Sequence, residues 1–148
     1  MYDPDFPDAT LYILMRTDMQ SLNAGKGMAQ AAHAANQFVH NFGNTMTPGY
    51  DDWKMGGGDS GARCVDVVRV SGFGTTIILA IFGEPVLRHY LDNAVKLGHP
   101  AEIILDPTYP VSDGEVTHLI PVHTCGYVFM KDRHENGGAL IEGLELHP

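Results

Sequence analysis

The sequence predicts an α/β fold: a three-layer sandwich in which helices flank a central four-stranded mixed sheet. Short apolar runs, typical of buried strands, alternate along the chain with longer stretches whose apolar residues recur at helical spacing. The two kinds of element follow one another rather than forming separate blocks, which favours helices packed on a sheet. The chain has 148 residues, a length typical of one domain, here residues 1–148.

The first part of the predicted domain is a strand, a loop and a helix. Residues 11–17 form an apolar run that ends in polar residues, and a loop rich in Asp, Ser, Asn and Gly follows. The helix is expected from Gly25 to about Asn41. Its expected buried stripe consists of Met28, Ala31, Ala32, Ala35 and Phe38.

The stretch at about residues 43–74 interrupts this pattern. Its first part has no periodicity and is rich in glycine, so we expect an inserted loop or hairpin on the surface. Trp53 is expected to anchor this insertion on the surface of the domain. Residues 63–70 alternate apolar and polar side chains, which indicates a hairpin strand or an extended excursion.

The second half is predicted to begin with a central strand at residues 75–83. An amphipathic helix follows over residues 84–100, with Pro85 in its first turn and Gly98 and Pro100 at its end. Leucine and valine recur at helical spacing in this segment, so one of its faces should be buried.

The chain is then expected to return twice to the sheet. A buried strand at residues 101–106 ends in an aspartate, residues 107–124 form a long loop, and residues 125–131 form the last strand. The tail, residues 137–148, is expected to contain a short final helix. Because loops after parallel strands gather at one end of such a sheet, the first loop and the loop after Asp106 should lie together.

The charge and composition exclude several classes of protein. The formal net charge is −9, which argues against broad, non-specific affinity for nucleic acid. No apolar run approaches the ~20 residues that span a membrane, and the acidic, proline-containing start is unlike a signal peptide. Two cysteines, Cys64 and Cys125, do not make a disulfide framework. We therefore expect a cytoplasmic protein without membrane association.

Three polar residues share one edge of the first helix, which is otherwise small and apolar. Lys26, Gln30 and His33 are spaced i, i+4 and i+7, so their side chains stack along one face. A lysine beside the free N–H groups of a helix start forms an anion-binding site. The surrounding residues lack the earlier glycine and the Ser or Thr of a P-loop, which excludes that nucleotide-binding motif.

Asp106 is the carboxylate best suited to act with Lys26. It ends an apolar strand at the mouth of the core, where the two side chains should lie close and favour each other's charged form. Such a pair can orient and polarise a water molecule, and the Thr124 hydroxyl can donate to the developing oxyanion. Taken singly, each residue also fits an ordinary structural place, such as a solvated lysine or a turn aspartate.

A metal site is the weaker alternative. His118, His123, Asp113 and Glu115 have suitable chemistry, but their spacing matches no compact zinc motif. We therefore expect no metal and no other cofactor, and we expect His33 to line the site without binding a metal.

The segment around the first helix resembles the opening signature of the type II peptidyl-tRNA hydrolases. That signature is a strand ending in Arg-x-Asp, a loop, and then Gly-Lys-x-x-x-Gln-x-x-His-Ala. It falls here on Arg16, Asp18, Gly25, Lys26, Gln30, His33 and Ala34. Residues 97–106, with a Gly-x-Pro helix end before a strand ending in aspartate, are also similar to the family. The resemblance covers most of the chain outside residues 43–74 and the tail.

The resemblance implies a metal-free enzyme that hydrolyses the ester between a peptide and the 3′ end of tRNA, and that often forms a homodimer. It assigns catalysis to Lys26, Asp106 and Thr124. Its implied substrate-binding residues are Arg16, Asp18, Gly25, Gln30 and His33. Thr108 is the nearest counterpart of a further family threonine, in a segment that differs from the family pattern after Asp106.

Two other functions fit the same fold. With its remodelled segment after Asp106, the domain can hold a nucleotide or small anionic ligand at the start of the Lys26 helix without catalysis. Alternatively, Trp53 and the glycine-rich insertion can form a protein-interaction module. The expected partners are accordingly peptidyl-tRNA or a smaller nucleotide-like ligand, with a second copy of the chain in a homodimer.

Overall fold

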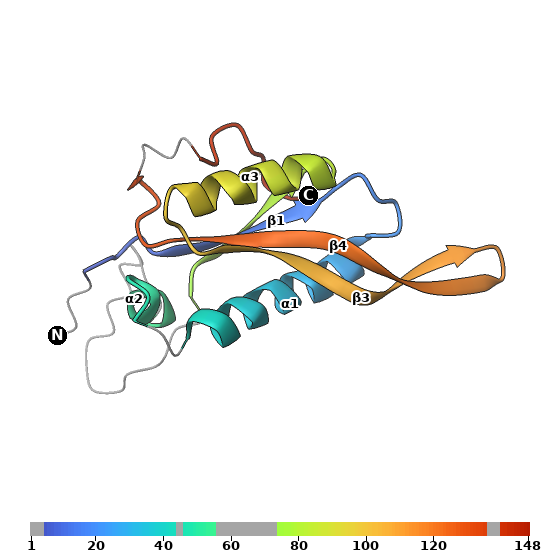
Figure 1. The fold of residues 1–148 in the computed structure, drawn as a ribbon, viewed down its shortest axis with the longest axis horizontal. Coiled ribbons are helices and arrows are strands. Elements are labelled where there is room, and N and C mark those ends of the chain that lie inside the picture. The colour runs from blue at the N-terminus through green and yellow to red at the C-terminus, as the bar shows by residue number, and fades with distance from the viewer. Residues whose placement is uncertain (1–4, 44–45, 56–73, 136–139) are drawn as a thin grey trace.

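The structure, a computed structural model, has the predicted α/β architecture (Figure 1). A four-stranded mixed sheet forms its middle layer, in the order β2 (Thr76–Ile81), β1 (Thr10–Arg16), β4 (Val116–Met130) and β3 (Ala101–Asp113). Helix α1 (Ala24–Phe42) packs on one face of the sheet and helix α3 (Glu84–Lys96) on the other. The structure describes residues 5–43, 46–55, 74–135 and 140–148.

Strand β1 (Thr10–Arg16) lies inside the sheet because it pairs on both sides. It runs parallel to β2 (Thr76–Ile81) and antiparallel to β4 (Val116–Met130). Its side chains alternate, so Ile13 belongs to the core beneath α1 and Leu14 to the core beneath α3. The prediction that β2 is central is wrong: β2 forms one edge of the sheet, and β1 and β4 are the two inner strands.

Helix α1 is confirmed, but the face that it buries differs from the predicted stripe. Met28 is 72% exposed and Ala32 is also exposed, so their predicted burial is wrong. The helix is instead turned so that Gln30 points inward, where Thr124 of β4 offers its amide a donor and Asp106 of β3 an acceptor. The buried residues of this face are Gly27, Gln30, Ala31, Ala34 and Phe38.

The described part of the insertion is not simply a loop. Residues 46–55 contain a short helix, α2 (Tyr50–Lys54), whose aromatic residues pack against the body of the domain. Residues 56–73 lie outside the described residues, and this range includes the predicted alternating segment at 63–70.

Trp53 of α2 anchors the insertion to the domain as predicted, but it does so within the core and not at the surface. It is only 3% exposed. Its ring stands edge-on to Phe38 at 5.2 Å between ring centroids, and its indole N–H donates to the Thr75 carbonyl. Gly74 has a φ of +78°, and a Cβ there would lie 2.2 Å from the indole, so only glycine fits beside this ring.

The predicted long loop at residues 107–124 is instead the outer part of a β-hairpin. Strand β3 (Ala101–Asp113) does not end at Asp106 but continues antiparallel to β4 as far as the turn. Residues 107–122 project beyond the helices, and we call them the arm (Figure 1). The apolar alternation of the arm is broken by Pro107, Pro110 and Pro121. These prolines make a paired segment look like a loop in the sequence.

The remaining elements close the domain. Helix α3 follows Gly83 and carries Pro85 in its first turn, as predicted. The predicted final helix is wrong for residues 140–148, which form a turn and then pair Leu146 with Leu79 of β2. This contact covers part of an otherwise open sheet edge. Among the described residues, no helix is long and apolar enough to cross a membrane.

Candidate active site between helix α1 and the hairpin

Lys26 lies in the first turn of α1 and points towards the arm. The Asn23 side chain caps the helix by accepting a hydrogen bond from the Lys26 N–H at 3.1 Å. The ammonium Nζ lies 3.4 Å from the Pro110 carbonyl, to which it donates, and 5.2 Å from the centre of the Tyr109 ring. The predicted direct pair of Lys26 with Asp106 is therefore not formed, since the lysine reaches past this carboxylate to the arm.

Gln30 joins the two other catalytic candidates. Its amide Nε2 donates to Asp106 Oδ2 at 2.7 Å, and its Oε1 accepts the Thr124 hydroxyl at 2.7 Å. Because an ionised carboxylate only accepts, the direction of this chain of bonds is fixed from Thr124 through Gln30 to Asp106. Gln30 is 4% exposed and Thr124 is 0% exposed, so water does not compete for the bond between them.

A β-bulge turns Thr124 towards α1. At this point β3 advances by one residue while β4 advances by two, which leaves Thr124 as an extra residue on β4. The alternation of faces is interrupted, so Thr124 and the adjacent Cys125 both contact Gln30. Burial raises the pKa of the Cys125 thiol to about 12, so this group is not a ready nucleophile.

Asp106 lies at a second bulge, on β3. Between Asp106 and Tyr109, β3 advances by three residues while β4 advances by two. The Thr108 N–H donates to Asp106 Oδ1 at 3.0 Å, so each carboxylate oxygen accepts one hydrogen bond. The carboxylate nevertheless stays partly exposed, with lone pairs left for a further donor. Thr108 contributes its backbone N–H to this site, and the residue as a whole is exposed.

Tyr109 forms a wall beside Lys26 and connects the arm to the loop before α1. The residue is buried, and its hydroxyl donates to Ser21 Oγ at 3.1 Å. Since this loop precedes the helix that carries Lys26 and Gln30, the contact couples the arm to the helix start.

Arg16 and Asp18 form a bidentate ion pair with each other. Arg16 Nε and Nη2 donate to the two Asp18 oxygens at 2.9 and 2.8 Å, and Nη1 donates to the His123 carbonyl at 2.9 Å. The Arg16 side chain is 12% exposed. Its hydrogen bonds hold the pKa of Asp18 below the usual range, and the Asp18 carboxylate in turn raises the pKa of Arg16.

Sequence reasoning missed a second charged cluster beside Arg16. Glu84 Oε1 accepts from Arg88 Nη2 at 2.7 Å and lies 3.0 Å from His123 Nδ1. The hydrogen bonds from Arg88 lower the pKa of Glu84. The i, i+4 spacing of Glu84 and Arg88 is visible in the sequence, but their contact with β4 depends on the fold.

Gly25 and His33 make few contacts in this region. Gly25 is exposed at the helix start, and a Cβ there would lie 3.6 Å from the Asn23 side-chain oxygen, an ordinary contact. His33 is exposed on the surface of α1. Within the described ranges, no three His, Cys, Asp or Glu side chains gather to hold a metal ion.

The polar edge of α1 extends further than Lys26, Gln30 and His33. Near the other end of the helix, Gln37 and Asn41 donate to Glu102 Oε2 at 3.0 and 2.6 Å, and the Tyr127 hydroxyl donates to the same oxygen. Lys26 and Gln30 likewise contact β3. The edge is therefore a contact between α1 and β3, and the candidate site lies at its Lys26 end.

Searches against protein-family models and against curated proteins find no match for this sequence. The class that the fold and site define is an α/β domain with a polar site. A partly exposed carboxylate, a lysine and a buried amide lie there between a helix start and a hairpin.

Proposed function

We propose that this chain is a carboxylic ester hydrolase of the peptidyl-tRNA hydrolase type, which releases peptide from tRNA in the cytoplasm. The observation that carries the proposal is the hydrogen bond from Gln30 to Asp106. It joins Gln30 of α1 to Asp106 of β3, two residues that are distant in sequence and that both match the pattern of the peptidyl-tRNA hydrolases. The first-turn Lys26 lies one helical turn from Gln30.

In the proposed reaction, Asp106 orients the attacking water. The Gln30 amide and the Thr108 N–H fix the carboxylate, which keeps lone pairs for a water O–H. The water oxygen attacks the ester carbonyl carbon, and the bond to the tRNA 3′ oxygen breaks. The water proton passes to that oxygen, so the products are a peptide carboxylate and a 3′-hydroxyl, with release of the carboxyl proton to solvent.

Lys26 supplies the positive charge in this scheme. Its ammonium has three donors and gives one to the Pro110 carbonyl, which leaves donors for the ester oxygen as negative charge develops. Thr124 acts indirectly, because it is buried and its one proton goes to Gln30. It is a positioning residue, and the sequence-based role as an oxyanion donor has no support in this geometry.

A second candidate function is binding of a small anionic ligand, such as a nucleotide, without catalysis. The observation that favours it is the local charge balance. Two cations of the described residues near the site are engaged, Arg16 by Asp18 and Arg88 by Glu84, so they add little to a phosphate-tracking surface. An interaction module centred on Trp53 has less support, since that side chain is buried.

Binding across a salt series separates the two functions. A tRNA enzyme should bind tRNA at low salt and lose affinity steeply as salt rises. Retained binding of a mononucleotide without tRNA binding at low salt would instead favour the small-ligand function. Release of peptide from peptidyl-tRNA by the purified protein tests the catalytic step.

A further inference from the structure

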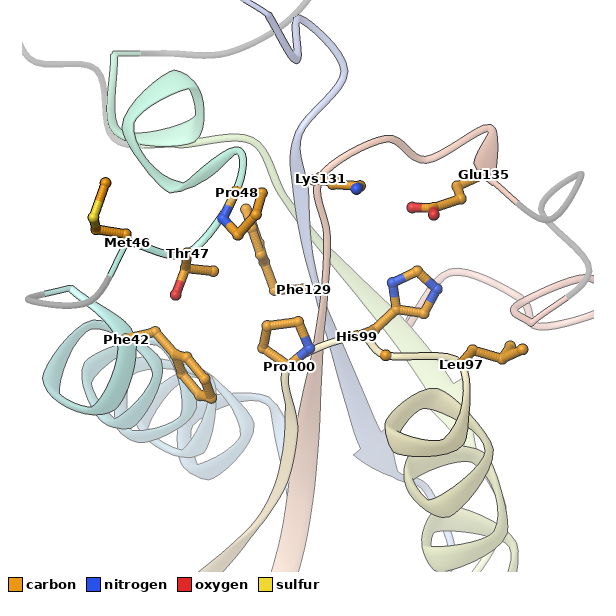
Figure 2. A pocket seen from close by; sticks show the side chains of 11 residues that line it. Phe42, Met46, Thr47, Pro48, Leu97, His99, Pro100, Phe129, Lys131 and Glu135 are labelled. Carbon is orange, nitrogen blue, oxygen red and sulfur yellow. The ribbon is translucent and has the colours of Figure 1, made fainter.

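A separate cavity of about 520 Å³ lies at the far end of the sheet from the candidate site. Figure 2 shows its apolar wall, to which Phe42, Pro48, Pro100 and Phe129 contribute. Its volume and mixed lining fall in the range of small-molecule sites. From Lys26 to Phe42 the rise along α1 is about 24 Å, so the cavity is independent of the catalytic proposal.

The polar part of the cavity contains a carboxylate, that of Glu135, with one oxygen that lacks a hydrogen-bond donor among the described residues. His99, Lys131 and Glu135 line this part (Figure 2). Glu135 Oε2 is buried and accepts no hydrogen bond from the described residues. A buried carboxylate oxygen without a donor is costly, and most such atoms in folded proteins are paired. Oε2 is enclosed, so a ligand in the cavity meets the rest of the Glu135 side chain, whose negative charge is not offset by a hydrogen bond from the described residues to this oxygen.

The ends of two helices give this cavity a preference for positive charge. Phe42 is the last residue of α1 and Leu97 follows the last residue of α3, and both line the cavity. The carboxyl end of a helix has partial negative charge and favours cations. The two helix ends and the Glu135 carboxylate thus act in the same direction.

From these contacts we infer that the cavity binds a small apolar molecule that carries a protonated amine. The ammonium donates to the Glu135 carboxylate, and the aliphatic or aromatic body packs against the wall formed by Phe42, Pro48, Pro100 and Phe129. This site is additional to the ester hydrolase function and does not depend on it.

Two neighbouring groups modulate the site. Burial lowers the pKa of His99, so its ring is neutral at pH 7 and does not repel a cation. Lys131 opposes the ligand charge, although its ammonium is partly engaged 5.4 Å from the centre of the Phe6 ring. Replacement of this lysine should therefore strengthen amine binding.

The test compares 2-phenylethylamine with its neutral analogue 2-phenylethanol by calorimetric or NMR titration of the whole protein. The amine should bind about tenfold or more tightly than the alcohol, as expected for a hydrogen bond between charged groups. Its amide shift changes should centre on residues 97–100 and 129–131. Equal affinity of the two compounds, no saturable binding of the amine, or shift changes centred on Lys26 would overturn the inference.

Variants test the role of Glu135. Glu135→Gln should remove most of the preference for the amine, whereas Glu142→Gln, a matched change at an exposed glutamate, should leave it intact. Lys131→Met should tighten amine binding several-fold, since it removes a like charge. Unchanged amine affinity in a folded Glu135→Gln protein would contradict the assignment. The wild-type comparison decides the inference if that variant does not fold.

Discussion

Replacement of Gln30 by leucine should destabilise the domain, because Thr124 and Asp106 lose their hydrogen bonds to the Gln30 amide. Gln30→Leu keeps a similar volume but removes the acceptor of the Thr124 hydroxyl and a donor to Asp106. Thr124 is fully buried, so its stranded hydroxyl should cost about 1–3 kcal/mol. Asp106 is partly exposed and can accept a hydrogen bond from water instead, so the loss of its bond to Gln30 should cost less. We expect the free energy of unfolding to fall by about 2–4 kcal/mol, measured by urea denaturation.

A double-mutant cycle isolates the buried bond. Thr124→Val removes the hydroxyl, and in the double variant with Gln30→Leu no polar group remains stranded. The double variant should therefore lose less stability than the sum of the two single losses, by about 1 kcal/mol or more. Additive losses, or a Gln30→Leu loss below about 0.5 kcal/mol, would refute the buried Thr124–Gln30 bond.

Three further predictions concern the core and its titratable groups. Phe38→Ala empties the centre of the aromatic cluster, so the free energy of unfolding, measured by the fluorescence of Trp53, should fall by about 3–5 kcal/mol. A fall of less than about 1 kcal/mol would contradict this packing. Burial raises the pKa of Glu102, but its hydrogen bonds outweigh that and hold the pKa below its ordinary value. Its stabilisation is present above that value and disappears at lower pH, so the stability gap between wild type and Glu102→Gln should narrow as pH falls; a constant gap in denaturation curves from pH 6 to 3 would count against it. In a Cys64→Ser protein, Cys125 should resist iodoacetamide at pH 8 until urea unfolds the chain; rapid labelling of the folded protein would show that Cys125 is accessible.

The sequence predicts the layers of this fold because periodicity reports burial over whole elements. The strand at β1 and the helices at α1 and α3 follow directly from it. The strands of the arm cannot be predicted from periodicity, because its prolines and exposed residues remove the alternation that marks a strand. The strand order also depends on tertiary packing, so the edge position of β2 could not be read from its apolar run.

The candidate site was predictable in its residues but not in its contacts. Lys26, Gln30 and Asp106 could be named from spacing and position alone. Which of them meet depends on two bulges, and a bulge shifts side-chain direction without a sequence signal of its own. The prediction therefore paired Asp106 with Lys26, whereas Gln30 holds the carboxylate.

The rate of peptide release from N-acetyl-aminoacyl-tRNA under single-turnover conditions tests the central claim most directly. Wild type should cleave the ester. Asp106→Asn should be slower by about 10²-fold or more, and Lys26→Met by a similar factor. Lys96→Met, a matched change at an exposed lysine of α3, should keep the wild-type rate. No release by folded wild type, or equal rates for Asp106→Asn and wild type, would contradict the account.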